Sequence, residues 1–197
     1  MDKKIIDYLA SLKKYGTEND IPNVTEEVGR FLNLMIKIKR PKNILEIGCA
    51  NGYSTIWMSE AIYKAKAKAK DISVKIHSID HSKPTFEEAK KNLVEIELDP
   101  YVQFYFGDAV KVISDFPSDL MFDFVFIDGE KRSYLNFWNV IQPRLNSRAV
   151  IIFDDMMAFP EKTKEFSKAI KSVTGFGQML LPIDGNDGIL LLVKQPE

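Results

Sequence analysis

The chain has 197 residues, of which 45% are hydrophobic and 28% charged, and its formal net charge is −1. This size and composition fit one globular domain, which we divide into a helical cap over residues 1–40 and an α/β core over residues 41–197. The near-neutral charge gives no general attraction to nucleic acid. The longest apolar runs are far shorter than the roughly 20 residues of a membrane helix.

The chain's cellular setting is indicated by its start and by its cysteine content. The first residues, MDKKIIDYLASLKKYG, lack the apolar core and cleavage site of a signal peptide. Cys49 is the one cysteine and cannot form an internal disulfide. We therefore expect a cytoplasmic protein with no membrane association.

Two helices are expected before residue 40. The first covers residues 4–15 and is predicted to stop at Gly16. Thr25 can cap the second helix, whose apolar positions fall on one stripe. The stripe consists of Val28, Phe31, Leu32, Met35 and Ile38. We expect both helices to lie over the C-terminal edge of the sheet that follows.

From residue 43 onward, apolar runs of strand length alternate with helical patterns, which predicts a mostly parallel sheet with crossover helices. The expected strands are residues 43–48, 75–80, 102–107, 122–128, 149–154, 178–182 and 189–194. The expected helices are residues 54–70, 83–96, 108–116, 133–145 and 161–174, and the lysine-rich KAKAKAKD at 64–71 is interpreted as an exposed helix end. The turn PIDGNDG leaves no room for a helix, so the last two of the seven strands form an antiparallel hairpin.

Acidic residues stand where the predicted strands end, in LEIGCANGYS, IDH, FGDA, FIDGEK and FDD. Ligand sites in such sheets form beyond the carboxyl ends of the strands. The spacing Glu46-x-Gly48-x-x-x-Gly52 is wider than that of dinucleotide-binding turns and suits a ligand with an amino-acid cation and a nucleoside. Asp80 could accept hydrogen bonds from a ribose diol. A tight turn without function is the alternative for the glycine pair.

Three carboxylates, those of Asp128, Asp154 and Asp155, are expected to meet at one edge of the sheet. Oxygen ligands of this kind suit Mg²⁺, and a bound cation would relieve the repulsion between adjacent acids. The competing interpretation is that Asp154 caps the following helix while Asp155 is solvated. The occurrence of DGEK together with DD favours the metal site.

Several motifs resemble, in order, those of the cation-dependent O-methyltransferases that use S-adenosylmethionine, a family that includes catechol and caffeoyl-CoA O-methyltransferases and small bacterial relatives. The motifs are ILEIGCANGYSTIWMSEAI, IHSID, FYFGDA, FDFVFIDGEKRSYLNFW and VIIFDD, within a match that spans residues 20–194. The resemblance implies the Rossmann-like class I methyltransferase fold with helices on both faces of the sheet. It also implies S-adenosylmethionine and Mg²⁺, or another divalent cation, as cofactors.

The same resemblance implies residue roles. The cofactor would be bound by Val24, in the stretch IPNV that resembles a closing segment, and by Glu46, Gly48, Gly52, Tyr53, Ser54, Asp80, His81, Asp108, Ala109 and Asp128. The metal would be bound by Asp128, Asp154 and Asp155, the last of which is Asn in most members. Lys131 would be the catalytic base beside Asp128, if the metal and burial depress its pKa. The alternative for Lys131 is a surface lysine near a helix start.

Other aromatic and sulfur-containing residues have separate interpretations. His77 is expected to be a core residue rather than a ligand. Tyr134, Phe137 and Trp138 have helical spacing and are also expected in the core. Met156, Met157 and Phe159 follow the metal acids and could form an apolar substrate wall.

These observations predict a metal-assisted O-methyltransferase that uses S-adenosylmethionine and acts on a small molecule with vicinal oxygens, such as a catechol. One alternative is a tRNA hydroxyuridine O-methyltransferase, for which the lysine run would matter, although the net charge makes a nucleic-acid partner less favoured. A non-catalytic S-adenosylmethionine-binding module is another. A nicotinamide dehydrogenase is disfavoured by the missing closely spaced glycine. The resemblance also implies a homodimer.

Overall fold

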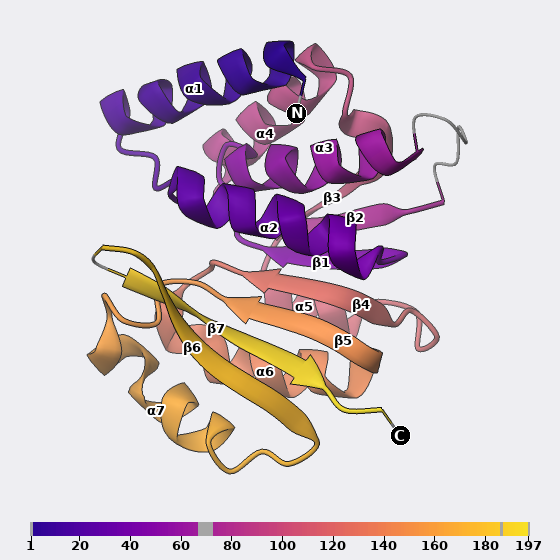
Figure 1. Cartoon of the computed structure of the whole chain (residues 1–197), viewed down its shortest axis with the longest axis vertical. Coiled ribbons are helices and arrows are strands. Elements are labelled where there is room, and N and C mark those ends of the chain that lie inside the picture. Colours follow the sequence, from indigo (N-terminus) through magenta and orange to yellow (C-terminus); the bar gives the residue numbers. More distant parts are fainter. Residues whose placement is uncertain (1, 67–72, 186, 197) are drawn as a thin grey trace.

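The computed structural model describes residues 2–66, 73–185 and 187–196. Its centre is a seven-stranded sheet with the order β3-β2-β1-β4-β5-β7-β6 (Figure 1). The strands are β1 (Asn43–Ile47), β2 (Lys75–Asp80), β3 (Val102–Phe106), β4 (Phe122–Ile127), β5 (Leu145–Phe153), β6 (Phe176–Asp184) and β7 (Asp187–Lys194). The first five pair in parallel, whereas β7 is antiparallel to both of its neighbours. The predicted fold class is confirmed.

Helices cover both faces of this sheet. They are α1 (Lys3–Glu18), α2 (Glu26–Lys39), α3 (Tyr53–Lys66), α4 (Lys83–Glu95), α5 (Ala109–Ser114), α6 (Tyr134–Ile141) and α7 (Pro160–Ile170). Helices α1 to α4 contribute to one buried apolar cluster and α5 to α7 to another, on opposite faces of the strands. In the described part of the chain, no helix is both long and apolar enough to cross a membrane.

The central strands are almost completely buried because helices cover both faces of the sheet. All but one residue of β4 are buried, and the same holds for β1 and β2. The start of β5 was predicted at residue 149, but the strand begins at Leu145, which pairs with Phe122. A register shift follows that pair, and Ser147 and Arg148 are exposed within it. This irregularity hid the first part of β5 from the apolar pattern.

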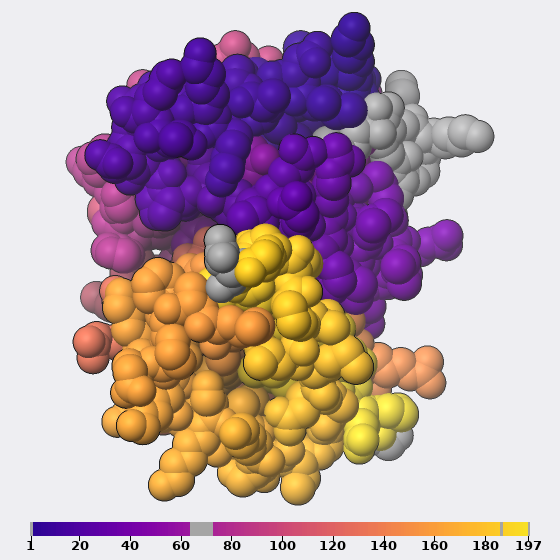
Figure 2. Space-filling model, turned by 60° about the vertical axis from the view of Figure 1, so that its left-hand side comes forward, coloured from indigo at the N-terminus to yellow at the C-terminus, as the bar shows by residue number. Residues whose placement is uncertain are grey.

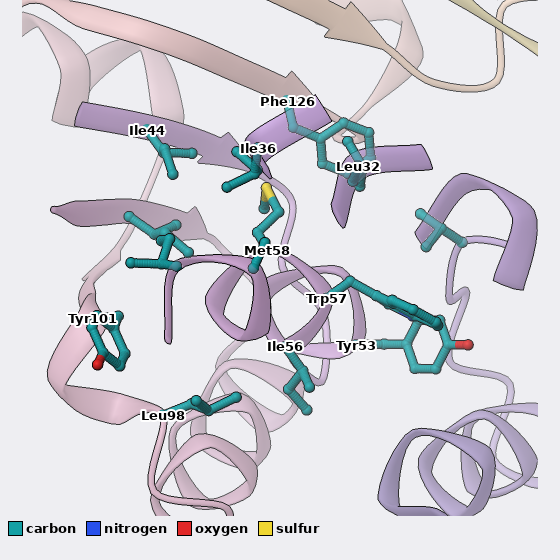
Figure 3. Packing of buried hydrophobic residues seen from close by; sticks show 14 of the residues in the cluster. Leu32, Ile36, Ile44, Tyr53, Ile56, Trp57, Met58, Leu98, Tyr101 and Phe126 are labelled. Carbon is teal, nitrogen blue, oxygen red and sulfur yellow. The ribbon is translucent and has the colours of Figure 1, made fainter. Parts of the chain in front are cut away.

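Helix α3 is buried on nearly every side, as Figure 3 shows for Ile56, Trp57 and Met58. The sheet covers one side of α3, and α2 covers another, where Leu32 belongs to the same core cluster. The N-terminal helices therefore pack over α3, and the prediction that they lie over the sheet's C-terminal edge is wrong for the helices themselves. Helix α2 also contacts β6, and Figure 2 shows these N-terminal residues directly above the C-terminal hairpin.

Two details of the N-terminal helices differ from the sequence prediction. Helix α1 does not stop at Gly16, which is buried within it, and a Cβ there would clash with the side chain of Asn23. Gly16 therefore allows a close approach of the segment that joins α1 to α2. Thr25 does cap α2, by accepting from the Val28 amide at 3.3 Å. Ile38, expected in the apolar stripe, is 75% exposed because α2 turns Ile36 toward the core instead.

The lysine-rich stretch is only partly included in the structure. Helix α3 is described as far as Lys66. The predicted extension to residue 70, and with it the interpretation of the lysine run as an exposed helix end, lies outside the described residues.

Candidate active site

A cavity of about 1020 Å³ lies at the carboxyl ends of the five parallel strands. The segments that follow these strands line it, together with residues 19–24 between α1 and α2. Of the predicted site residues, those that line the cavity are Val24, Gly48, Tyr53, Ser54, Asp80, His81, Asp108, Ala109, Asp128, Lys131, Asp154 and Asp155. Glu46 and Gly52 are described but do not line it. The strand-end acids thus face one common space.

Glu46 lies beneath the turn that follows β1. Its carboxylate accepts hydrogen bonds from the hydroxyls of Ser54, Thr55 and Ser78 at 2.6–2.7 Å, and the residue is fully buried. Burial raises the pKa of Glu46 to about 7, against the opposing effect of the three hydroxyls. These bonds join β1 to β2 and to the start of α3, so Glu46 shapes the turn from below.

Gly48 is required by the close approach of two strand ends. Its φ is +88°, and a Cβ there would clash with the backbone carbonyl of Asp128. The Gly48 amide donates to the Ile79 carbonyl at 2.9 Å. A side chain at residue 48 would therefore be both conformationally strained and sterically excluded.

Asp80 organises the same turn through its carboxylate. One oxygen accepts from the amides of Cys49 and Ala50 at 3.0 and 2.8 Å, and the other accepts from the Ser82 amide at 2.8 Å. A carboxylate can accept about four hydrogen bonds. Asp80 therefore holds the turn and retains acceptor capacity on the oxygen that faces Ser82.

Lys131 links two of the predicted metal acids. Its ammonium lies 2.6 Å from Oδ1 of Asp128 and 2.7 Å from Oδ2 of Asp155, and its side chain is only 13% exposed. Asp154 is buried beside them, with its carbonyl accepting from the Tyr134 hydroxyl at 2.9 Å. The interpretation of Lys131 as an ordinary surface lysine is therefore wrong.

The pKa values of this cluster follow from burial and from its surplus of negative charge. Burial raises the pKa of Asp128 to about 6, with Lys131 opposing, and raises those of Asp154 and Asp155. Burial acts to lower the pKa of Lys131, but Asp128 and Asp155 outweigh it and the net shift is upward. From the sequence, we expected a depressed pKa for Lys131 beside a bound metal. Beside carboxylates alone, the pKa of Lys131 is raised.

The two adjacent acids are not arranged as a helix cap and a solvated residue. The N-cap position of α7 is Phe159, which makes no side-chain cap, so the interpretation of Asp154 as a capping residue is wrong. Asp155 has a φ of +53°, a conformation that Asp and Asn tolerate better than most residues. Its carboxylate is bound to Lys131 and is not simply solvated.

The donor chemistry of the cluster fits a hard divalent cation. Asp128, Asp154 and Asp155 offer only carboxylate oxygens, and the Lys131 ammonium already provides positive charge between two of them. As they stand, no three or more His, Cys, Asp or Glu side chains of the described residues are grouped so as to hold a metal ion. Binding a cation would therefore require these carboxylates to rearrange around Lys131.

Asp187 was not identified from the sequence. Its carboxylate accepts from the amides of Met157 and Ala158 at 2.8 and 2.9 Å, and its charge helps to raise the pKa of Asp155. It lies in the turn PIDGNDG, where its acidity was the one available signal. Asp187 fixes the chain that follows the two strand-end acids.

The remaining predicted residues divide between core and cavity. His77 is a satisfied core residue whose Nδ1 lies 3.0 Å from the Tyr105 hydroxyl. Tyr134, Phe137 and Trp138 are buried as expected, although Phe137 also lines the cavity. In the expected apolar wall, Phe159 lines the cavity whereas Met156 and Met157 do not.

Lys13 holds the segment of residues 19–24 in place. Its ammonium donates to the carbonyls of Asn23 and Val24 at 2.7 and 2.9 Å and lies 5.6 Å from the centroid of the Tyr53 ring. Both Tyr53 and Val24 line the cavity. Lys13 therefore fastens one cavity wall to helix α1, a long-range role that no local motif shows.

Replacing Lys13 with methionine is expected to loosen this wall, because two hydrogen bonds from a charged donor are lost. We expect amide exchange in residues 19–24, measured by mass spectrometry, to become roughly tenfold faster. Lys14→Met is the matched control, since Lys14 is 79% exposed and its ion pair with Glu18 is at 3.7 Å. Equal exchange rates in the two variants would contradict this role for Lys13.

Comparisons with known proteins show which family the chain resembles. The family model described as O-methyltransferase matches residues 3–192. A catechol O-methyltransferase of Niastella koreensis is 26% identical over 162 residues, which cover 80% of this chain and 70% of the relative. A caffeoyl-CoA O-methyltransferase of Medicago sativa is 27% identical over 142 residues, covering 70% of this chain and 54% of the relative.

Solved structures share the architecture. An O-methyltransferase from Bacillus cereus in complex with SAH superposes with a TM-score of 0.83 at 22% identity, covering 96% of this chain and 91% of the other. The O-methyltransferase TomG from Streptomyces achromogenes, in complex with SAM, gives a TM-score of 0.84 at 20% identity, covering 99% and 91%. The class I methyltransferase fold is thereby confirmed. With its family match over nearly the whole length, this chain belongs to the O-methyltransferase family.

Proposed function

We propose that this protein transfers the methyl group of S-adenosylmethionine to one oxygen of a small molecule with vicinal oxygens, with the help of a divalent cation. One observation carries the proposal: a single cavity joins the Gly48 turn and Asp80 to the cluster of Asp128, Lys131 and Asp155. The first group suits a nucleoside bearing an amino acid, and the second suits the reacting oxygens. Methyl transfer needs both in one space.

We call the part of the cavity lined by Gly48, Asp80, Asp108 and Ala109 the cofactor half, and the part lined by Asp128, Lys131, Asp154 and Asp155 the acceptor half. Hydrogen bonds support the role proposed for the cofactor half. Asp80 is held by three backbone amides and keeps acceptor capacity for a ribose hydroxyl. The Asp108 side chain caps α5 by accepting from the Lys111 amide at 2.9 Å. Asp108 and Ala109 both line the cavity. The wall formed by residues 19–24 would cover the bound cofactor.

The acceptor half would hold the cation through Asp128, Asp154 and Asp155. When bound, a divalent cation lowers the pKa of a hydroxyl beside it. Lys131 is the residue that would accept the hydroxyl proton on Nζ, because it is the one lysine among these acids in the described part of the chain. It does so only from its neutral form, which the contacts with the two carboxylates disfavour because they raise the pKa of Lys131.

The alternatives from the sequence gain no support from the described residues. The lysine run that would favour a tRNA substrate lies mostly outside them. The homodimer stays a prediction, for which exposed apolar side chains on α2 and β6, including Leu34, Ile38 and Met179, offer surface.

The proposal is tested first by cofactor binding. We expect titration calorimetry to detect S-adenosylmethionine binding to the wild type, and Asp80→Ala to weaken it about tenfold or more, since hydrogen bonds to a charged group each contribute roughly 1.5–3 kcal/mol. Asp119→Ala is the control, because Asp119 is exposed and does not line the cavity. No binding by the wild type, or equal binding by Asp80→Ala, would count against the proposal.

A further inference from the structure

A second lysine, Lys162, lines the cavity at the first turn of α7. Its ammonium lies 4.6 Å from the centroid of the Phe159 ring, which also lines the cavity and is 38% exposed. Phe159 follows the acidic pair by four residues. Lys162 therefore places a positive charge beside an aromatic surface in the acceptor half of the site.

Within the described part of the chain, no ion pair neutralises the charge of Lys162. Among the described residues, the cavity is lined by two lysines, Lys131 and Lys162. Lys131 is bound to two carboxylates, whereas no carboxylate of the described residues lies within ion-pair distance of Lys162. The neighbouring acid on α7, Glu161, is paired instead with Lys164 at 3.6 Å. Lys162 is thus available to a ligand.

The acidic cluster and Lys162 give the two sides of the acceptor half opposite charges. The cluster of Asp128, Asp154 and Asp155 would repel an anionic group, while Lys162 would attract one. A substrate with hydroxyls on one side of an aromatic ring and an acidic group on the other could satisfy both ends at once, with its ring against Phe159. A cationic substituent near Lys162 would meet like charge.

We propose that Lys162 makes this enzyme select aromatic substrates that carry a carboxylate or another acidic substituent in addition to their vicinal hydroxyls. The inference rests on the proposed function, because the hydroxyls are assigned to the acidic cluster. Because Lys162 is exposed, solvent screens its attraction for the acidic substituent of the substrate, and the effect on selectivity is modest. We expect a three- to tenfold effect on kcat/KM.

The test compares three catechols with the same ring and one different substituent: 3,4-dihydroxybenzoate (anionic), 4-methylcatechol (neutral) and 3,4-dihydroxybenzylamine (cationic). Wild type is expected to prefer the benzoate. Lys162→Met should lower kcat/KM for the benzoate three- to tenfold and change that for 4-methylcatechol less than twofold. Lys162→Glu should shift the preference toward the amine. Lys164→Met is the control, because Lys164 is on the same helix, is exposed, and does not line the cavity.

The outcomes separate this inference from the proposed function. Turnover by wild type with no preference for the benzoate, or an equal loss on all three substrates in Lys162→Met, would overturn the selection by charge and leave the proposed function intact. A wild-type preference for the amine would do the same. Failure to methylate any of the three, with Mg²⁺ and S-adenosylmethionine present, would overturn the proposed function and this inference with it.

Discussion

Replacing Asp154 with alanine is expected to lower Mg²⁺-dependent methyl transfer to a catechol by roughly a thousandfold. Asp154 is buried at the end of β5, beside Asp128 and Asp155, and its carboxylate is the member of the cluster that makes no ion pair with Lys131 among the contacts described. Charge stabilisation at such a site contributes several kcal/mol, and each 1.36 kcal/mol is a factor of ten in rate. The assay is turnover against Mg²⁺ concentration, with calorimetric Mg²⁺ binding measured in parallel.

A milder substitution in the same pair serves as the control. Asp155→Asn keeps an oxygen ligand and a side chain that tolerates the positive φ of this residue, so it should remain active. A chelator should abolish the activity of both wild type and Asp155→Asn. Full wild-type activity in chelator, or unchanged Mg²⁺ binding and turnover in Asp154→Ala, would show that this cluster does not hold a catalytic cation.

Replacing Gly48 with alanine is expected to lower the free energy of unfolding by about 3 kcal/mol and to abolish cofactor binding. The residue combines a φ of +88° with a Cβ position blocked by the Asp128 backbone. Backbone strain of this kind costs of order 1–3 kcal/mol, and the clash must also push the ends of β1 and β4 apart. Urea unfolding measures the stability, and titration with S-adenosylmethionine measures the binding.

Substitutions at two other glycines distinguish the cost of backbone strain from the cost of a steric clash. Gly175 has a φ of +80° but open space around it, so Gly175→Ala should lose only about 1–2 kcal/mol and still bind the cofactor. Gly177 has neither a positive φ nor a near neighbour, so Gly177→Ala should be nearly neutral. If all three variants lost equal free energy of unfolding, the steric clash with the Asp128 backbone would not contribute to the loss at Gly48.

The sheet could be predicted because strand-length segments alternate with helical patterns along the chain, and because β4 and the second part of β5 are mostly apolar, as burial on both faces requires. Helix and strand limits were less accurate where a distant contact decided them. Gly16 was interpreted as a stop signal, but it is buried because Asn23 packs against it. The early start of β5 depends on pairing of Leu145 with Phe122, which no local pattern reveals.

The position of the site could also be predicted from the sequence, but the contacts of its residues could not. Parallel strands end at one edge, so acids at their carboxyl ends had to approach one another, and Asp80, Asp128 and Asp154 do line one cavity. What each group contacts could not be inferred from its position in the chain. Lys13 binds carbonyls ten and eleven positions further along the chain, and backbone carbonyls carry no sequence signal. The carboxylate of Glu46 is likewise enclosed by three hydroxyls from distant positions.

The cavity is assembled in chain order, and this has a consequence for how such enzymes can diversify. Residues up to Ala109 supply the half assigned to the cofactor, and those from Asp128 onward supply the half assigned to the acceptor. A recombinant chimera that exchanges the second part among relatives should therefore acquire a new acceptor range while it inherits its methyl donor unchanged. At the cavity the two parts meet where Gly48 approaches the Asp128 backbone, above the pairing of β1 with β4, so a successful crossover must keep both residues.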